Sequence, residues 1–140
     1  MNAIKRKISS VIVLAALLLI NHSCSSQTTN NNIEGVWKGT SLCQVKNSPC
    51  HDESVVCHIS KSSKADMYTI EMNKIVNNAE EEMGALDFSY DKSSQTLTCT
   101  KRDQQQREST WKLIIKGSQI TGTLIHEGNI LYRKIEVSKK

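Results

Sequence analysis

The 140-residue chain has little of what most enzymes and metalloproteins depend on. It contains one proline and only six aromatic residues, namely 2 Trp, 3 Tyr and 1 Phe. It has no glycine-rich phosphate loop, no Ser-His-Asp arrangement and no paired-carboxylate motif. Five cysteines are present, but no two of them have the Cys-x2-Cys spacing of common zinc sites. We therefore expect no catalytic activity, no metal and no cofactor.

A basic stripe for nucleic-acid binding is also missing. The precursor carries 18 Lys and Arg against 14 Asp and Glu, a net charge of +4. Three of the basic residues and none of the acidic ones precede Cys24. The remainder of the chain therefore has 15 basic and 14 acidic residues, a net charge of about +1. Such a balance predicts no nucleic-acid partner.

The first residues have the pattern of an export signal. Lys5, Arg6 and Lys7 form a basic head, and residues 8–20 follow as an apolar run. These 13 residues are too few to cross a bilayer comfortably as a helix, for which ~20 are needed. The pattern is typical of a secretory signal, which we assign to residues 1–23. An uncleaved short membrane anchor is the alternative.

The segment around Cys24 resembles the lipobox of bacterial lipoproteins, in which a diacylated cysteine becomes the new N-terminus. Ser23 matches the small residue of that motif, whereas Asn21 stands where the family usually has Leu. Residues 25–32 are polar and uncharged, as expected of a flexible tether. The resemblance implies attachment to a membrane of the bacterial cell envelope, on the periplasmic or outer-membrane face. Cleavage without lipid is the alternative.

From residue 33 onward the sequence reads as strands. Eight segments alternate apolar and polar residues with a period of two, namely 33–45, 54–60, 67–76, 83–90, 96–101, 110–116, 119–126 and 130–137. The pattern predicts an all-β domain over residues 33–140, an eight-stranded antiparallel up-and-down barrel that leaves no exposed edge. A two-sheet sandwich is the alternative. Residues 77–83, around Glu80, Glu81 and Glu82, are predicted to be a charged loop.

The connections differ at the two ends of the predicted barrel. Residues 61–66, 91–95 and 117–118 are compact turns at one end. Residues 46–53, 77–82 and 103–109 join strands at the other end and are mostly longer. This asymmetry predicts a closed bottom and an open mouth. His51, Asp52 and Glu53 belong to the mouth, where we interpret them and the outward-facing His58 as solvated polar residues rather than as a metal cluster.

Four cysteines remain in the domain once Cys24 is set aside. Cys43 and Cys50 flank six residues of the first long connection, and a disulfide between them is favoured. A Cys43–Cys57 bridge is the main rival. Cys57 and Cys99 fall on inward positions of strands that stand across the barrel from each other, so we expect buried thiols.

Two features resemble the calycin superfamily, the lipocalins and their relatives. Gly35-Val36-Trp37 opens the first strand, and Arg133 lies among inward-facing aliphatic residues of the last. In calycins a basic residue of the final strand packs across this tryptophan at the closed end, so the resemblance implies a Trp37–Arg133 pair. The chain is most similar to compact lipocalin-like domains of bacterial lipoproteins, and it lacks the helix that follows the barrel in most lipocalins.

The resemblance implies a monomeric protein that holds a small apolar or amphipathic ligand inside the barrel. A pocket of ~300 Å³ or more would support this role. The inward residues expected to line it are Ile70, Met72, Leu86, Phe88, Trp111 and Leu113. The alternative is a barrel filled by its own side chains, acting through its mouth loops on an envelope component or a protease.

Overall fold

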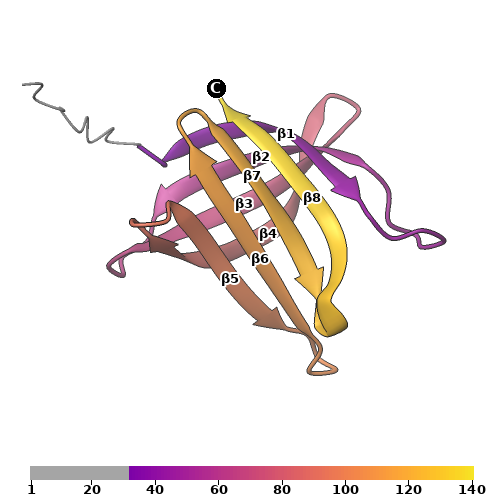
Figure 1. The fold of residues 1–140 in the computed structure, drawn as a ribbon. Helices are drawn as coiled ribbons and strands as arrows, with labels where there is room; N and C mark the ends of the chain where they lie inside the picture. Colours follow the sequence, from indigo (N-terminus) through magenta and orange to yellow (C-terminus); the bar gives the residue numbers. More distant parts are fainter. Residues whose placement is uncertain (1–31) are drawn as a thin grey trace, which may run out of the picture.

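The computed structural model describes residues 32–140 (Figure 1). The predicted signal peptide, Cys24 and almost all of the predicted linker lie outside the described residues. Within them, eight antiparallel strands form one closed barrel in which each strand pairs with the next and β8 pairs with β1. This topology confirms the up-and-down barrel rather than a sandwich. No helix in this part of the chain is long and apolar enough to cross a membrane.

The strands follow the predicted order closely. They are β1 (Gly35–Cys43), β2 (Glu53–Lys61), β3 (Met67–Val76), β4 (Ala79–Asp91), β5 (Thr96–Arg102), β6 (Glu108–Lys116), β7 (Gln119–His126) and β8 (Ile130–Lys139). A short 3-10 turn, Glu127–Asn129, precedes β8. Alternate residues of each strand face the interior, which is why the period-two pattern was visible in the sequence.

The closed end of the barrel is filled by large apolar side chains. Trp37 and Phe88 are 1% and 0% exposed, and Leu97 is also fully buried. Ile33 is buried beneath the barrel, and its carbonyl oxygen accepts a hydrogen bond of 2.9 Å from the Trp37 indole nitrogen. The tryptophan thereby joins the segment before β1 to the core and satisfies its own polar group.

The strand β4 starts earlier than the sequence predicted. Glu80, Glu81 and Glu82, expected in a loop, belong to β4 and pair with β3. The reason is the tight connection between the two strands. Asn77 and Asn78 both have positive φ, 50° and 65°, which is the geometry of a two-residue hairpin turn whose twist matches the strands. The prediction of a charged loop over residues 77–83 is therefore wrong.

The tip of the β3–β4 hairpin reaches the outer face of β1 and β2. The Glu80 carboxylate accepts hydrogen bonds from His58 in β2 at 2.7 Å and from Asn73 in β3 at 3.0 Å. It also lies 3.9 Å from the Lys38 ammonium of β1. Val56 and Asn73 are directly paired on the outer face, yet they are only 0% and 5% exposed. The folded-back hairpin thus builds a small second layer outside the barrel.

A break in register marks where the hairpin bends. The β3–β4 pairing shifts between Met72 and Asn73, and Gly84, the last partner before the shift, has a φ of +123°. Such a φ is disfavoured for residues with a side chain and free for glycine. A bulge of this kind locally increases the bend and twist of a strand pair. The bulge therefore directs the hairpin tip away from the strand that follows it.

The barrel wall is also split between β4 and β5. These strands pair at only three positions, Asp91 with Thr96, Tyr90 with Leu97, and Ser89 with Thr98. Beyond Ser89, β4 has no partner on the β5 side. In Figure 1 the β3–β4 turn lies at the upper right and the β5–β6 turn at the bottom of the view. We call this opening the β4–β5 split.

Candidate functional site

A cavity of about 270 Å³ occupies the inside of the barrel. It extends from Ile120 and Val137 up to Ser41 and Glu53 at the mouth. Five of the six predicted ligand-contacting residues line it, namely Ile70, Met72, Leu86, Trp111 and Leu113. Phe88, the sixth, does not line the cavity, because it is fully buried in the core. Contact of the five with a ligand stays a prediction.

The cavity reaches the surface at the β4–β5 split. Its lining includes four residues from the part of β4 that has no partner in β5, namely Met83, Gly84, Ala85 and Leu86. It also includes Lys101, from the part of β5 that has no partner in β4. Met83 is 46% exposed, although it borders the interior. A continuous β4–β5 pairing would close the wall here. Because the pairing is absent, the apolar interior is accessible from the side of the barrel.

Arg133 lies at the mouth and not beside Trp37. It is paired with Cys43 across the β1–β8 ladder, whereas Trp37 is paired with Lys139, six residues farther along β8. The predicted Trp37–Arg133 pair is therefore wrong. The Lys139 ammonium takes the predicted position, 5.5 Å from the centre of the Trp37 ring. A basic residue of the last strand does cover the tryptophan, but it is the one whose register places it at the closed end.

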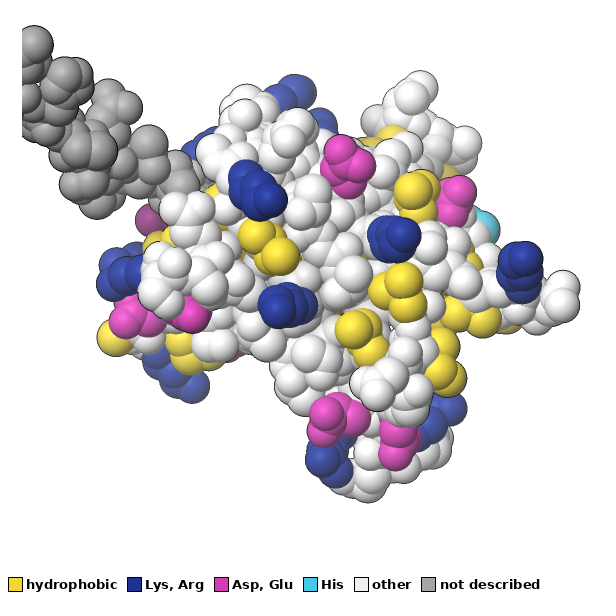
Figure 2. Space-filling view, in the orientation of Figure 1, with side chains coloured by type: hydrophobic (Ala, Val, Ile, Leu, Met, Phe, Trp, Pro, Cys, Tyr) yellow, Lys and Arg dark blue, Asp and Glu magenta, His cyan; other side chains and the backbone are white. Residues whose placement is uncertain are grey.

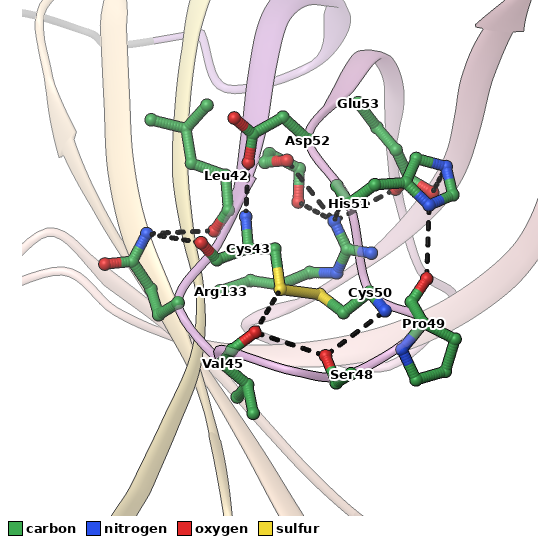
Figure 3. The surroundings of a disulfide bond; sticks show 12 residues. Leu42, Cys43, Val45, Ser48, Pro49, Cys50, His51, Asp52, Glu53 and Arg133 are labelled. Atoms are coloured by element: carbon green, nitrogen blue, oxygen red, sulfur yellow. Dashed lines mark hydrogen bonds and ion pairs between the residues drawn. A yellow bond between two sulfur atoms is a disulfide. The ribbon is translucent and has the colours of Figure 1, made fainter.

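Arg133 instead binds groups from two strands and a loop (Figure 3). Its guanidinium lies 3.1 Å from the Glu53 carboxylate, and it donates to the Ser41 hydroxyl at 3.2 Å and to the His51 carbonyl at 3.3 Å. The side chains of Arg133 and Glu53 are 13% and 14% exposed. Charges that are largely withdrawn from solvent are tolerated when they are paired and hydrogen-bonded. The hydrogen bond to the His51 carbonyl ties the first long loop to the barrel wall.

The first long loop is also closed by a disulfide. Cys43 and Cys50 are bonded, with Cα atoms 5.8 Å apart, which confirms the favoured pairing. The Asp52 carboxylate accepts a hydrogen bond of 2.8 Å from the Cys43 backbone N–H (Figure 3). The bridge closes a short loop, for which the chain-entropy model gives a stabilisation of about 2–3 kcal/mol.

Cys57 and Cys99 are free thiols, and the predicted burial holds for Cys57, whereas Cys99 is only partly buried. Cys57 lines the cavity and is 7% exposed. Burial raises the pKa of its thiol from the ordinary 9.0 to about 11. The pKa of the Cys99 thiol is also raised, mainly by burial and further by the negative charge of Asp87. Both groups are therefore neutral and weakly nucleophilic near pH 7.

The residues that were considered as a metal cluster and interpreted as solvated polar residues do not form a single group. His51 lies 3.9 Å from the Glu53 carboxylate at the mouth, whereas His58 binds Glu80 on the outer face. Within residues 32–140 no three His, Cys, Asp or Glu residues are grouped closely enough to hold a metal ion. His58 is nonetheless more than a solvated polar residue, because it holds the β3–β4 hairpin in place.

A serine–histidine contact at the rim was not foreseen. The Ser109 hydroxyl lies 2.7 Å from the His126 Nδ1, and the ring of His126 meets Tyr132 edge-on, with centroids 4.2 Å apart. Among the described residues no carboxylate is hydrogen-bonded to this imidazole. The contact joins β6, β7 and β8 where the pairing of β7 with β8 shifts register. We interpret it as a structural contact that holds the three strands together.

Sequence reasoning missed the polar residues of the cavity. Glu53 and Lys101 both line it, and neither was proposed as a site residue. A signal was available, because Glu53 shares the inward parity of Val55 and Cys57, and Lys101 shares that of Leu97 and Cys99. A charge on an inward position near a strand end marks the mouth of a barrel or a break in its wall.

Comparisons with known proteins show the fold alone. No protein-family model matches the chain, and no curated protein matches it. A crystal structure of an alanine variant of the fluorescent protein UnaG is similar, with a TM-score of 0.51 and 13% sequence identity. The likeness covers 77% of this chain and 96% of that one. The chain therefore shares the barrel fold of that protein.

Proposed function

We propose that this protein binds a small apolar or amphipathic molecule inside its barrel. The observation that supports the proposal is the cavity of about 270 Å³, lined mostly by apolar side chains and open at the β4–β5 split. The volume lies just below the ~300–1,000 Å³ typical of small-molecule pockets. The ligand is accordingly small, and burial of its apolar part supplies most of the binding free energy.

The competing role is that of an interaction protein with a filled barrel and an active mouth. The disulfide-closed loop over residues 44–52 is compatible with that role. The cavity argues against it, since a filled barrel would contain no interior space. We also infer that the protein has no catalytic activity, because the residues lining the cavity offer no activated nucleophile: its one thiol, that of Cys57, has a raised pKa.

Native mass spectrometry tests the binding role. The domain over residues 25–140, which lacks the proposed lipid-bearing Cys24, is purified without detergent, and its mass is compared under native and denaturing conditions, before and after solvent extraction. We expect an excess mass that extraction removes and that Met72→Trp, which fills the cavity, abolishes. The control is Leu42→Trp, at an exposed position of β1. A bare mass, with no uptake of added apolar dyes, would contradict the binding role. The same spectra test the inference that the protein is monomeric.

We further propose that Cys24 carries a lipid that tethers the domain to the bacterial cell envelope. The basic head, the apolar run and the Ser23-Cys24 junction support this proposal. Fractionation of cells that express the wild-type chain and Cys24→Ser provides the test, together with the mass of the N-terminal peptide. We expect a diacylated peptide and membrane retention only with Cys24. Recovery of both chains in the soluble fraction would contradict the tether.

A further inference from the structure

The cavity has one charged lining residue whose charge is not balanced. Three of its lining residues carry a charge, namely Glu53, Lys101 and Arg133. Glu53 and Arg133 form an ion pair at 3.1 Å and neutralise each other. Lys101 takes part in none of the ion pairs or side-chain hydrogen bonds found among residues 32–140. Lys101 therefore brings an unbalanced positive charge to the edge of the cavity.

The position of Lys101 follows from the register of its strand. Cys99 is paired with Trp111 and Lys101 with Ser109, so Lys101 lies on the same face of β5 as Cys99 and Leu97, the face that meets the core. Its side chain lines the cavity and is at the same time exposed. A lysine in such a place lays its methylene stem along the apolar wall and keeps its ammonium at the water boundary.

The β4–β5 split explains why this lysine is tolerated. If the three existing β4–β5 pairs were continued, Leu86 would stand directly opposite Lys101 on the inner face. The ammonium would then be enclosed among apolar groups without a partner, at a high cost in free energy. Because the strands separate at Ser89 and Thr98, the ammonium stays at the edge of the cavity.

We propose that Lys101 binds the anionic group of the ligand, which makes the ligand a small amphipathic anion. This inference rests on the proposed binding function and specifies its ligand class. The apolar body lies against Met72, Leu86 and Trp111, and a carboxylate, sulfonate or phosphate group meets the ammonium at the split. Arg133 is less suited to this role, because Glu53 neutralises its charge at 3.1 Å and its Nη1 already donates to the Ser41 hydroxyl and the His51 carbonyl.

Two dyes with the same apolar body test the proposal. 8-Anilinonaphthalene-1-sulfonate carries one negative charge, and N-phenyl-1-naphthylamine is the same skeleton without it. Their affinities are measured by fluorescence titration with the wild-type protein and with Lys101→Met, which keeps the length of the stem. Lys101→Arg keeps the charge. Lys112→Met is the matched control, since Lys112 lies on the adjacent strand β6, is exposed and does not line the cavity.

We expect Lys101→Met to weaken binding of the anionic dye about five- to tenfold, the range of one charge-assisted contact at a partly solvated site. The uncharged dye should bind within about twofold of the wild type, because the apolar contacts are unchanged. Lys101→Arg should retain most of the anion affinity, and Lys112→Met should leave both dyes unaffected. The anion preference of the wild type should fall as salt is added.

The outcomes separate this inference from the proposed function. If the uncharged dye binds and Lys101→Met leaves the anionic dye unchanged, the anion site is refuted while the binding function stands. An equal loss of both dyes in Lys101→Met would also refute it, since it would indicate a purely apolar role for the stem. If neither dye binds the wild-type protein and Met72→Trp changes nothing, the binding function fails and the anion site fails with it.

Discussion

At the residue scale, two positions of the barrel wall leave no space for a side chain. A Cβ on Gly39 of β1 would lie 2.8 Å from the Val137 Cα and would collide with the Glu136 carbonyl. A Cβ on Gly122 of β7 would lie 2.6 Å from the Lys112 carbonyl oxygen. Both glycines are required by close strand approach and not by an unusual φ. They tighten the curvature of the wall rather than enlarge the cavity.

Gly122→Ala is expected to lower the free energy of unfolding by about 2–4 kcal/mol. The added methyl group meets backbone atoms that cannot rotate away, so neighbouring strands must shift. Urea unfolding followed by tryptophan fluorescence measures the effect. Thr121→Ala, at the neighbouring exposed position, is the control and should change stability far less. Equal unfolding midpoints for the two variants would contradict the prediction, since they would show that the strands accommodate the methyl group at little cost in free energy.

The buried Cys57 thiol predicts a loss of stability in alkali. Its pKa is 9.0 in an unfolded chain and about 11 in the fold. Between these values the unfolded state releases a proton that the folded state keeps, so stability is full below pH 9 and falls as pH rises toward 11. The total loss is about 2–3 kcal/mol. Stability of the wild type and of Cys57→Ala is measured across this range, and the wild type should show the steeper decline.

Single residues also show how far the sequence could be interpreted. Parity along each strand predicted the five cavity-lining residues, because the side-chain period of two does not depend on neighbouring strands. The predicted partner of Arg133, Trp37, was wrong because the residues that meet across the strands depend on the register between β1 and β8. Glu53 lies far from Arg133 in the sequence, and only the closed barrel brings the two side chains together.

At the scale of elements, the β3–β4 hairpin is held by one carboxylate. We expect Glu80→Ala to release the tip of the hairpin, because the Glu80 side chain contacts Lys38, His58 and Asn73 from three strands. Hydrogen exchange measures the result: amides of residues 74–82 should exchange faster, while those of the closed-end core keep their protection. Glu82→Ala, two residues along the same strand, is the control. Unchanged exchange in Glu80→Ala would mean that backbone pairing alone holds the tip.

Acid should release the same hairpin in the wild type. The pKa of Glu80 is lowered below the ordinary 4.5, chiefly by the hydrogen bond from His58 and then by that from Asn73. A lowered pKa means that the carboxylate stabilises the fold above pH 4.5 and that this contribution is lost as pH falls. The sequence could not indicate this role, because three consecutive glutamates have the composition of a solvated loop and their partners lie on other strands.

At the scale of the whole molecule, the closed barrel and the β4–β5 split have different origins. Each strand has one apolar face, and that pattern was sufficient to predict a closed barrel. The alternation of Leu86, Phe88 and Tyr90 continues straight through the point where β4 leaves β5, so it gives no sign of the split. The split depends on where the pairing of β4 with β5 ends, at Ser89 and Thr98. Figure 2 shows basic and acidic side chains interspersed on the visible face, without a continuous basic stripe.

The route by which a ligand enters follows from this architecture. The cavity meets solvent where Met83 lines the β4–β5 split with its side chain 46% exposed. If ligands pass there, Met83→Trp should slow both association and dissociation of an uncharged dye, and Met83→Ala should speed both. The dissociation constant should change little, because an obstacle at an entrance raises the barrier in both directions equally.

Stopped-flow fluorescence with N-phenyl-1-naphthylamine measures the two rate constants. Ile130→Trp is the matched control, because Ile130 is 54% exposed and begins β8 at the rim of the open end. If Ile130→Trp slows exchange and the Met83 variants do not, ligands enter through the mouth. In that case the split serves only to keep the Lys101 ammonium in water. If the Met83 variants alone change the rates, ligands enter through the β4–β5 split, and loss of the Glu80 contacts, which hold the tip of the β3–β4 hairpin, should alter the same rate constants.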